Sequence, residues 1–350
     1  KFKKSSKFKV KIILSGQHDE MIEQVMEVFN LKADIDFRLL QTCNSINELS
    51  SKIIRELGVI FSSDIPDLVF VQGDTSTALS GGLAAFFSKI PIAHIEAGLR
   101  TNNLFSPFPE EANRRIISQI ATLHFAPTKL AVQNLRNYGI SKNVYLSGNT
   151  VIDALNQFKN LEKINTLKKL NIEKGKYILI TVHRRENWGE SIKKISQSIL
   201  DILEKNKDLK FVFPCHKNPL IRNSFKEFLS FNKNVLLIEP LPYLEFIYLM
   251  KFARIVLTDS GGIQEEAATL GKPTIILRDS TERPEVLDKG NAVLAGNDPK
   301  KIASFANSIM LDEFKYESMS RKIDDFGKGE SSAYIYKKIF EFLNYKIKKI

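Results

Sequence analysis

Short apolar runs alternate with amphipathic runs along most of this chain. In the amphipathic runs, such as 45–61 and 190–206, apolar residues recur at helical spacing. Alternation of strands and helices predicts parallel sheets with helices on both faces. The strand candidates are 9–15, 67–73, 91–97, 122–127, 143–148, 177–183, 209–216, 234–240, 254–260, 273–279 and 292–296.

The alternation comes in two series, and 350 residues are enough for two domains. A lysine-rich stretch at 161–176 follows the first series. The pattern therefore predicts two doubly wound α/β domains, divided near residue 160, with a cleft between them. The chain shows neither internal repeats nor low-complexity segments.

Composition narrows the class of protein. Hydrophobic residues make up 43% and charged residues 26%, as in ordinary globular proteins. The apolar runs are too short to span a bilayer, and no apolar signal region follows the basic start. Cys43 and Cys215 have no metal-type spacing and suit a reducing compartment, so we expect a cytoplasmic protein. The net charge of +11 comes from dispersed lysines, which favours a solvated surface over a nucleic-acid groove and also suits phosphorylated small molecules.

Polar residues stand where predicted strands end. In open α/β sheets, ligands bind beyond the carboxyl ends of the strands. Five such positions in one chain predict a binding or catalytic site. They are Asp74, Glu96, His183, His216 and Asp259.

Residues 258–285 read TDSGGIQEEAATLGKPTIILRDSTERPE. A helix that starts at Gly261-Gly262 would leave its first N–H groups open to a phosphate. Ser260 could add a hydroxyl, and Glu266 could accept hydrogen bonds from both ribose hydroxyls. The alternative is a tight turn capped by Asp259 or Ser260. The acidic residue and the following STERPE favour a nucleoside-diphosphate site.

Residues 94–115 carry the second candidate cluster. Glu96 ends a strand, and Glu110 opens a helix that contains Arg114 on the same face. Together with Asp74 these carboxylates would converge at one sheet edge, which suits general acid/base chemistry. Glu111 is interpreted as an acid matched to the positive end of the helix.

Three further side chains have a functional and a structural interpretation. His183, beside Arg184 and Arg185, is a candidate donor to a departing phosphate. His216 either contacts the ligand or caps local structure. Phe246 has apolar neighbours at helical spacing, which by itself indicates core.

Several motifs occur in a specific order and spacing, although no single one is decisive. They are VQGDTSTAL, HIEAGLRT, SPFPEEANR, SGNTVIDAL, VHRREN, LTDSGGIQEEA, LGKP and TERPE. Together they resemble the bacterial non-hydrolysing UDP-N-acetylglucosamine 2-epimerases, and the resemblance runs from about Lys9 onward.

The resemblance implies a fold and a reaction. The fold is like that of GT-B glycosyltransferases, with two Rossmann-like domains around a substrate cleft. The reaction is reversible C2 epimerisation of UDP-GlcNAc to UDP-ManNAc, by anti elimination of UDP and its re-addition to 2-acetamidoglucal. It would supply precursors of cell-surface polysaccharide. It implies no nicotinamide cofactor and no metal, a cytoplasmic homodimer, and no nucleic-acid or membrane partner.

The resemblance also implies roles for residues. The acid/base carboxylates would be Asp74, Glu96 and Glu110, with Arg114 and His183 as ionic partners. Ser260, Gly261 and Gly262 would form the phosphate cradle, Glu266 would bind ribose, and Arg283 and His216 would line the nucleotide site. Phe246 would pack on uracil, which overrides its interpretation as core. Gln17 and His18 would lie near a second UDP-GlcNAc that activates the enzyme.

The expected domain bounds follow from the same resemblance and from the pattern at the end of the chain. The terminal run 331–350 predicts a helix that returns to the first domain. We expect an N-terminal domain of residues 1–160 plus 333–350 and a C-terminal UDP-binding domain of residues 161–332. The family opens with a further strand and a basic Gly-Thr-Arg-Pro-Glu loop, which these residues lack. We therefore expect the native protein to be longer by one βα unit of roughly 25–30 residues.

Other functions remain open at this stage. Related epimerases act on other UDP-acetamido sugars, and hydrolysing relatives release free ManNAc. A GT-B glycosyltransferase would share the nucleotide half, and a sensor or polyanion-binding protein would lack catalysis. The three crowded carboxylates favour epimerisation.

Overall fold

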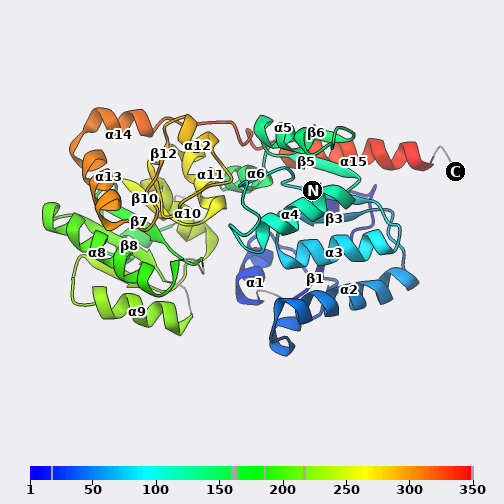
Figure 1. Ribbon diagram of the computed structural model, residues 1–350, viewed down its shortest axis with the longest axis horizontal. Coiled ribbons are helices and arrows are strands. Elements are labelled where there is room, and N and C mark those ends of the chain that lie inside the picture. Colours follow the sequence, from blue (N-terminus) through cyan, green and yellow to red (C-terminus); the bar gives the residue numbers. More distant parts are fainter. Residues whose placement is uncertain (17–18, 159–163, 185–186, 216–217, 348–350) are drawn as a thin grey trace. The chain divides into compact units, whose positions relative to one another are not determined.

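The computed structural model describes residues 1–16, 19–158, 164–184, 187–215 and 218–347, and it divides into two compact units. Unit 1 comprises Lys1–Asp153 and Asp325–Ile350, and unit 2 comprises Ala154–Asp324. Both units are built from parallel strands joined by helices (Figure 1).

Unit 1 contains two parallel sheets, one with the order β1-β2 and one with the order β3-β4-β5-β6. Its strands are β1 (Ile13–Leu14), β2 (Ile35–Asp36), β3 (Val69–Gln72), β4 (Ile92–Ile95), β5 (Leu123–Ala126) and β6 (Val144–Leu146). Its helices are α1 (Asp19–Val28), α2 (Ile46–Ser63), α3 (Ser76–Phe87), α4 (Glu110–Ile120), α5 (Lys129–Asn137) and α15 (Ser331–Ile347), with 3-10 turns at Phe2–Lys4 and Leu39–Thr42.

Unit 2 is a single six-stranded parallel sheet with the order β12-β11-β10-β7-β8-β9. Its strands are β7 (Tyr177–Thr181), β8 (Lys210–Pro214), β9 (Val235–Ile238), β10 (Ile255–Thr258), β11 (Thr274–Ile276) and β12 (Ala292–Leu294). Its helices are α7 (Thr166–Lys169), α8 (Glu190–Lys205), α9 (Pro219–Leu229), α10 (Tyr243–Phe252), α11 (Gly261–Leu270), α12 (Glu285–Asp288), α13 (Pro299–Leu311) and α14 (Glu313–Met319). Helix α6 (Thr150–Gln157) crosses the division between the units.

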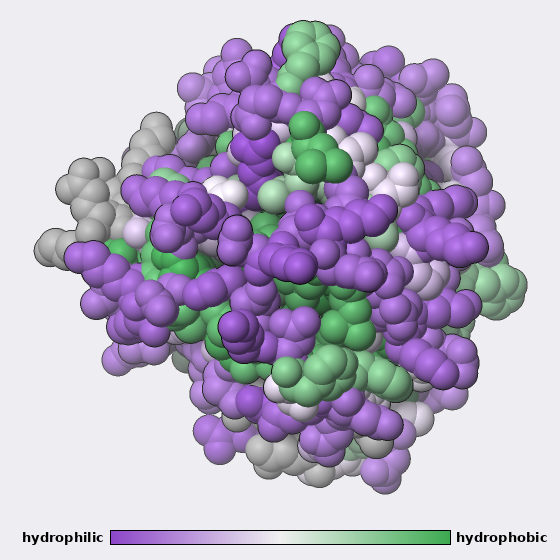
Figure 2. All heavy atoms as spheres, turned by 90° about the vertical axis from the view of Figure 1, so that its left-hand side faces the viewer, coloured by the Kyte–Doolittle hydropathy of each residue, from purple (hydrophilic) through white to green (hydrophobic). Residues whose placement is uncertain are grey.

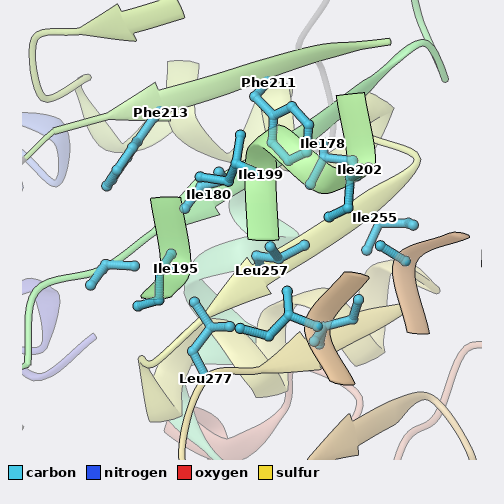
Figure 3. Packing of buried hydrophobic residues seen from close by; sticks show 14 of the residues in the cluster. Ile178, Ile180, Ile195, Ile199, Ile202, Phe211, Phe213, Ile255, Leu257 and Leu277 are labelled. Atoms are coloured by element: carbon cyan, nitrogen blue, oxygen red, sulfur yellow. The ribbon is translucent and has the colours of Figure 1, made fainter. Parts of the chain in front are cut away.

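Alternate residues of β7 enter two different cores. Ile178 and Ile180 pack with α8, α9 and α13, whereas Tyr177 and Leu179 pack with α10 and α11. This period of two follows from the pleat of a strand, and a strand covered on both faces is apolar throughout. Figure 3 shows Ile178 and Ile180 among side chains that include Ile199 of α8.

The face of the molecule that Figure 2 shows is mostly hydrophilic, as the dispersed charged residues of the sequence predict.

The units divide after Asp153 and before Asp325, whereas the sequence predicted division at residues 160 and 333. Local contacts explain why unit 1 resumes at Asp325. Asn149 N–H donates to the Phe326 carbonyl oxygen at 2.7 Å, and Asp153 accepts from Ser331 N–H and Ser332 N–H at 3.0 and 2.8 Å. The segment ahead of α15 therefore belongs to unit 1. Helix α15, red in Figure 1, adds Ile335 and Ile339 to a core with Leu123 and Phe125 of β5.

The strand predicted at 9–15 is shorter than expected, since only Ile13 and Leu14 form a strand. In the part of the chain that the structure describes, β1 pairs with β2 and with no other strand. Strand pairing on one side alone leaves the remaining residues of the run without a regular ladder. Strand β2, which the sequence did not predict, is just as short.

Candidate active site

Two carboxylates of unit 1 lie at the ends of neighbouring strands. β3 pairs with β4 in parallel register, and Gly73 N–H donates to the Ile95 carbonyl oxygen at 2.9 Å. Asp74 follows Gly73, and Glu96 follows β4. A Cβ on Gly73 would lie 3.5 Å from Glu96 Oε2, so the Glu96 carboxylate lies against this glycine. The two strand ends therefore bring Asp74 and Glu96 to one edge of the sheet.

Glu96 has a backbone conformation that is unusual for a residue with a side chain. Its φ is +63°, in the left-handed region. Such a conformation costs about 1–3 kcal/mol and is concentrated at active sites and ligand clamps. The fold retains this cost at the residue that the sequence selected for proton transfer.

Arg114 joins α4 to the strand ends. Its guanidinium is buried and pairs with Asp74, with Nε 3.0 Å from Asp74 Oδ2. A second pair joins Arg114 Nη1 to Glu111 Oε2 at 3.0 Å. The sequence placed Arg114 beside Glu110 by helical spacing, whereas its carboxylate partners in the structure include Asp74 and Glu111.

Glu110 occupies a different position from its neighbour Glu111. The Oε2 atom of Glu110 is buried and has no hydrogen-bond partner among the described residues. A buried carboxylate oxygen without a donor is costly in a folded protein. Such an oxygen suits a group that accepts a proton from a substrate.

Glu111 lies in the first turn of α4, where the sequence interpreted it as matched to the positive helix end, and it is also fully buried in an ionic network. Its Oε1 accepts from Arg115 Nε at 2.8 Å, and its Oε2 accepts from Arg114 and from Thr101 N–H at 3.1 Å. Arg100, which the sequence also missed, is buried nearby and donates to Ser118 Oγ at 3.0 Å. Burial, partly offset by the charge of Glu111, lowers the pKa of Arg100 to about 10. The spacing of charges in the sequence could not show which of these arginines and glutamates are buried and which pair with one another.

In unit 2, His183 and Asp259 meet at the ends of β7 and β10. His183 Nδ1 lies 3.1 Å from Asp259 Oδ1, while 46% of the imidazole is exposed. Asp259 also accepts from Arg184 N–H at 2.9 Å and from Asn187 Nδ2 at 3.0 Å. Burial by itself raises the pKa of Asp259, but the bonds from His183, Asn187 and Arg184 lower it below its usual value. The ionised carboxylate thus orients an accessible imidazole.

The N-terminus of α11 has no side-chain cap. Ser260 occupies the N-cap position without a side-chain cap bond, and Asp259 is engaged with His183 and Arg184. The first N–H groups of a helix need partners and carry partial positive charge. Of the two alternatives from the sequence, this geometry favours an anion site over a capped turn.

The two glycines at this helix start face different surroundings. A Cβ on Gly261 would overlap the Arg283 guanidinium and lie 2.7 Å from Glu282 Oε1. A Cβ on Gly262 would meet nothing within 4 Å. Gly261 therefore makes room for Arg283, and the open space for a ligand lies beside Gly262.

Arg283 belongs to a buried ionic network. Its Nε lies 2.5 Å from Glu265 Oε1, and its Nη1 lies 2.5 Å from Glu282 Oε1. Glu282 also accepts from Arg278 Nη1 at 2.8 Å. The sequence selected Arg283 but missed Glu265, Glu282 and Arg278. Arg278 and Glu282 are near Arg283 in the chain, whereas Glu265 reaches it only through packing. The network fixes the loop that follows β11 against α11.

Glu266 is buried and accepts from the Tyr243 hydroxyl at 2.7 Å. Burial raises the pKa of Glu266 to about 7; the Tyr243 hydrogen bond opposes this shift and the charge of Glu265 adds to it. Tyr243 begins α10, and Phe246, one turn later, is half-buried against the core of unit 2. Phe246 therefore packs on the core while part of its ring stays accessible.

Three candidate residues lie outside the described residues: Gln17, His18 and His216. Within the residues that are described, no group of three or more His, Cys, Asp or Glu side chains could hold a metal ion. The same part of the chain contains no helix long and apolar enough to cross a membrane.

Solved structures define the class of the fold. A Neisseria meningitidis UDP-GlcNAc 2-epimerase bound to UDP-GlcNAc superposes with a TM-score of 0.93 at 42% identity, over 97% of this chain and 94% of that chain. An S. aureus protein solved with UDP gives a TM-score of 0.92 at 37% identity, over 98% and 91%. The protein therefore has the GT-B-like fold of nucleotide-sugar enzymes, with two parallel α/β domains.

Sequence comparison then identifies the family. The UDP-N-acetylglucosamine 2-epimerase family model matches residues 1–340. The N. meningitidis serogroup A relative of that name is 46% identical over 334 residues, which cover 93% of this chain and 90% of the relative. The chain belongs to the UDP-N-acetylglucosamine 2-epimerase family.

Proposed function

We propose that the protein interconverts UDP-GlcNAc and UDP-ManNAc by inversion at C2, as a non-hydrolysing epimerase. The observation that carries this proposal is the set of carboxylates at the ends of β3 and β4 and the start of α4, with Glu110 Oε2 buried and unpaired. Proton removal from C2 needs a positioned base, and return on the other face needs an acid.

The proposed chemistry conserves all atoms. A carboxylate removes the C2 proton while the C1–O bond breaks, and both electrons of that bond leave with UDP. This step leaves 2-acetamidoglucal and UDP as the intermediate pair. UDP then adds back to C1 while a proton reaches the opposite face of C2. Asp74, Glu96 and Glu110 would share the proton transfers, and the ion pair with Arg114 would orient the Asp74 carboxylate.

Unit 2 would bind the nucleotide. The N–H groups at Gly261 and Gly262 and the Ser260 hydroxyl would receive the diphosphate. His183, held by Asp259, would donate to the departing phosphate. Glu266 would accept the ribose hydroxyls and Phe246 would pack on uracil. Arg283 would line the nucleotide site and hold the loop after β11 in place. His216 would be a further residue in contact with the nucleotide.

The wider proposal concerns assembly and regulation. We propose a cytoplasmic homodimer that needs neither metal nor organic cofactor and that supplies precursors of cell-surface polysaccharide. Gln17 and His18 would lie near a second, activating UDP-GlcNAc. Activity that rises cooperatively with UDP-GlcNAc, and that loses cooperativity in His18→Ala, would support that site.

Incubation with UDP-GlcNAc in deuterated water tests the reaction. We expect UDP-ManNAc with deuterium at C2 by NMR and mass spectrometry. Free ManNAc with UDP would indicate a hydrolysing enzyme instead. Transfer of GlcNAc to an acceptor without deuterium at C2 would indicate a glycosyltransferase. Exchange only with another UDP-acetamido sugar would keep the chemistry and change the substrate.

A further inference from the structure

The carbonyl oxygen of Gly73 lacks the backbone partner that a regular parallel ladder would give it. Gly73 N–H donates to the Ile95 carbonyl oxygen at 2.9 Å, so the next bond of that ladder would run from Ala97 N–H to the Gly73 carbonyl oxygen. Ala97 N–H donates instead to the Phe125 carbonyl oxygen of β5, at 3.0 Å. The residue before Ala97 is Glu96, whose left-handed backbone turns this peptide away from β3.

A side chain takes the place of the missing backbone bond. His94 Nε2 lies 2.8 Å from the Gly73 carbonyl oxygen. Because a carbonyl oxygen only accepts, Nε2 carries the hydrogen, and Nδ1 of the neutral imidazole is unprotonated. His94 belongs to β4 and stands two residues before Glu96. The strand that ends in the left-handed residue therefore also supplies the replacement donor.

The imidazole of His94 is fully buried and paired at one nitrogen. Its side chain is 0% exposed, and Nδ1 has no hydrogen-bond partner among the described residues. Burial lowers the pKa of His94 to about 3; the hydrogen bond to Gly73 opposes this shift, and the charges of His124, Arg100 and Arg114 add to it. The ring is therefore neutral near pH 7. In the described chain, its only hydrogen bond is the one to the strand end beside the carboxylates.

The peptide after Asp74 is held from α4. Asn113 Nδ2 donates to the Asp74 carbonyl oxygen at 2.7 Å, and the next residue, Arg114, pairs with the Asp74 carboxylate. His94 binds the carbonyl oxygen of the peptide before Asp74. Both peptides that flank the Asp74 Cα atom are thus anchored by side chains, and the direction of the Asp74 carboxylate depends on both anchors.

We propose that His94 is a positioning residue for epimerisation, an inference that rests on the proposed function. Its Nε2–H replaces the ladder bond that the left-handed turn at Glu96 removes, and this bond fixes the peptide between Gly73 and Asp74. The Asp74 and Glu96 carboxylates are thereby held in register across the two strand ends. Without this donor, β3 and β4 still pair, but the Asp74 carboxylate shifts relative to the sugar. A displacement of about 1 Å can lower a rate about 10²-fold.

Two substitutions of similar side-chain length test the donor. His94→Gln places an amide N–H near the position of Nε2, whereas His94→Met fills the same space without a donor. We expect His94→Met to lower kcat for UDP-GlcNAc by about 10–10²-fold and to leave KM within about twofold, because the nucleotide is bound by unit 2. His94→Gln should restore kcat to within about threefold of the parent. Equal kcat values in the two variants, or a change in KM alone, would overturn the proposal.

His124 offers the matched control. It is the register partner of His94 on β5 and is 2% exposed, and burial lowers its pKa to about 4. Its hydrogen bond is to the backbone of Ala121, before β5 and away from the carboxyl ends of the strands. His124→Met should therefore keep kcat within about twofold of the parent. Urea unfolding defines conditions in which each variant is folded, and kinetics are measured there. An equal loss of kcat in His124→Met and His94→Met would assign the effect to packing and overturn the proposal.

The hydrogen position on His94 is measured without substrate. In parent protein labelled with ¹⁵N-histidine, NMR at about pH 7 should show the neutral Nε2–H tautomer for the signal that His94→Gln removes. An Nδ1–H tautomer or an imidazolium at this position would overturn the proposal. Absence of epimerisation in the parent protein would instead contradict the proposed function, and the positioning role would fall with it. A parent that epimerises UDP-GlcNAc while His94→Met retains its kcat would overturn the positioning role alone.

Discussion

Glu110 and Glu111 are adjacent residues with opposite physical situations. Glu110 has a buried oxygen without a hydrogen-bond partner in the described chain, whereas both oxygens of Glu111 accept hydrogen bonds in a buried network. An unpaired carboxylate is available for chemistry, and a fully paired one is committed to structure. We therefore expect substitution of Glu110 to affect activity and substitution of Glu111 to affect stability.

Glu110→Gln should reduce turnover about 10²–10⁴-fold, because a general acid or base contributes about that much. UDP affinity and the unfolding midpoint should stay near those of the parent protein, since Glu110 Oε2 has no partner to lose. Steady-state kinetics, calorimetry with UDP and urea unfolding measure the three quantities. Glu27→Gln, at an exposed position of α1, is the control. Turnover within a few-fold of the parent would remove Glu110 from the mechanism.

Glu111→Gln should lower the free energy of unfolding of unit 1 by about 1–3 kcal/mol, because charged hydrogen bonds to a buried carboxylate are lost, although Arg114 keeps its pair with Asp74. Arg114 and Arg115 both lose a carboxylate in this variant. Urea unfolding, followed by circular dichroism, measures the change in the free energy of unfolding. A loss below about 1 kcal/mol, the usual worth of an exposed pair, would show that Glu111 is not a structural anchor.

Glu266 should make stability depend on pH in a defined direction. Its pKa is about 7 in the fold, above the ordinary 4.5, so folding favours the protonated form. This contribution is complete below the unfolded pKa and is lost as pH rises through about 7. Relative to Glu266→Gln, the parent should lose up to about 1.4 kcal/mol per pH unit across that interval.

Urea unfolding of both proteins at several pH values gives this difference directly. If hydroxyl groups of a bound ribose donate to Glu266, they favour its ionised form. UDP-GlcNAc should then bind more tightly as pH approaches 7, and Glu266→Gln should bind weakly at every pH. A stability difference that stays constant with pH would show that Glu266 is ionised throughout.

From the sequence, candidate residues at strand ends are easier to select than partners that only packing brings together. Asp74, Glu96 and His183 follow predicted strands, and Glu266 was selected by its place in a helix that begins with two glycines. In the buried network, Glu282 pairs with Arg278 and Arg283 within one loop, and Arg283 joins this loop to Glu265 of α11. Such pairing depends on three-dimensional packing and leaves no period in the chain.

At the scale of elements, the start of α11 separates two reasons for glycine. The space beside Gly261 is filled by Arg283 and Glu282, and the space beside Gly262 is open. A sequence of two glycines cannot show which one makes room for protein and which one for ligand. The packing of the loop after β11 decides between them.

Gly262→Val should weaken UDP binding by about 1–3 kcal/mol while it keeps the fold, because its side chain would occupy the open space at the helix N-terminus. Gly261→Ala should lower the free energy of unfolding instead, since its Cβ would displace Arg283 from Glu265 and Glu282. Calorimetry and urea unfolding on both variants separate the effects. Unchanged UDP affinity in Gly262→Val would place the diphosphate elsewhere.

The strands of unit 2 were predicted closely, whereas those at the start of unit 1 were not. β7 to β12 are apolar runs paired within one sheet, so the hydrophobic pattern was sufficient. The run 9–15 has the same pattern, yet it forms only Ile13–Leu14 as strand. Strand formation requires a neighbour as well as a suitable sequence, and a pattern within one segment cannot report that neighbour.

At the scale of the whole molecule, unit 1 is discontinuous in sequence. Its last helix, α15, contributes Ile335 and Ile339 to the core around Leu123 and Phe125. The single tryptophan of the chain, Trp188, packs on the core of unit 2. Trp188 fluorescence therefore reports on unit 2, and far-ultraviolet circular dichroism reports on both units.

The double substitution Ile335→Ala/Ile339→Ala should unfold unit 1 and leave unit 2 folded. Both side chains are 1% exposed, and each large-to-small change in a core costs about 2–5 kcal/mol. The sum approaches the whole stability of a typical domain, about 5–15 kcal/mol. Circular dichroism should show a transition that is lost or shifted to much lower urea, while the Trp188 transition stays in place. Lys337→Ala, between the two isoleucines and exposed, should change neither signal. If the Trp188 transition moved together with the circular dichroism in the double variant, the two units would unfold as one cooperative body, and the division at residues 153 and 325 would have no thermodynamic meaning.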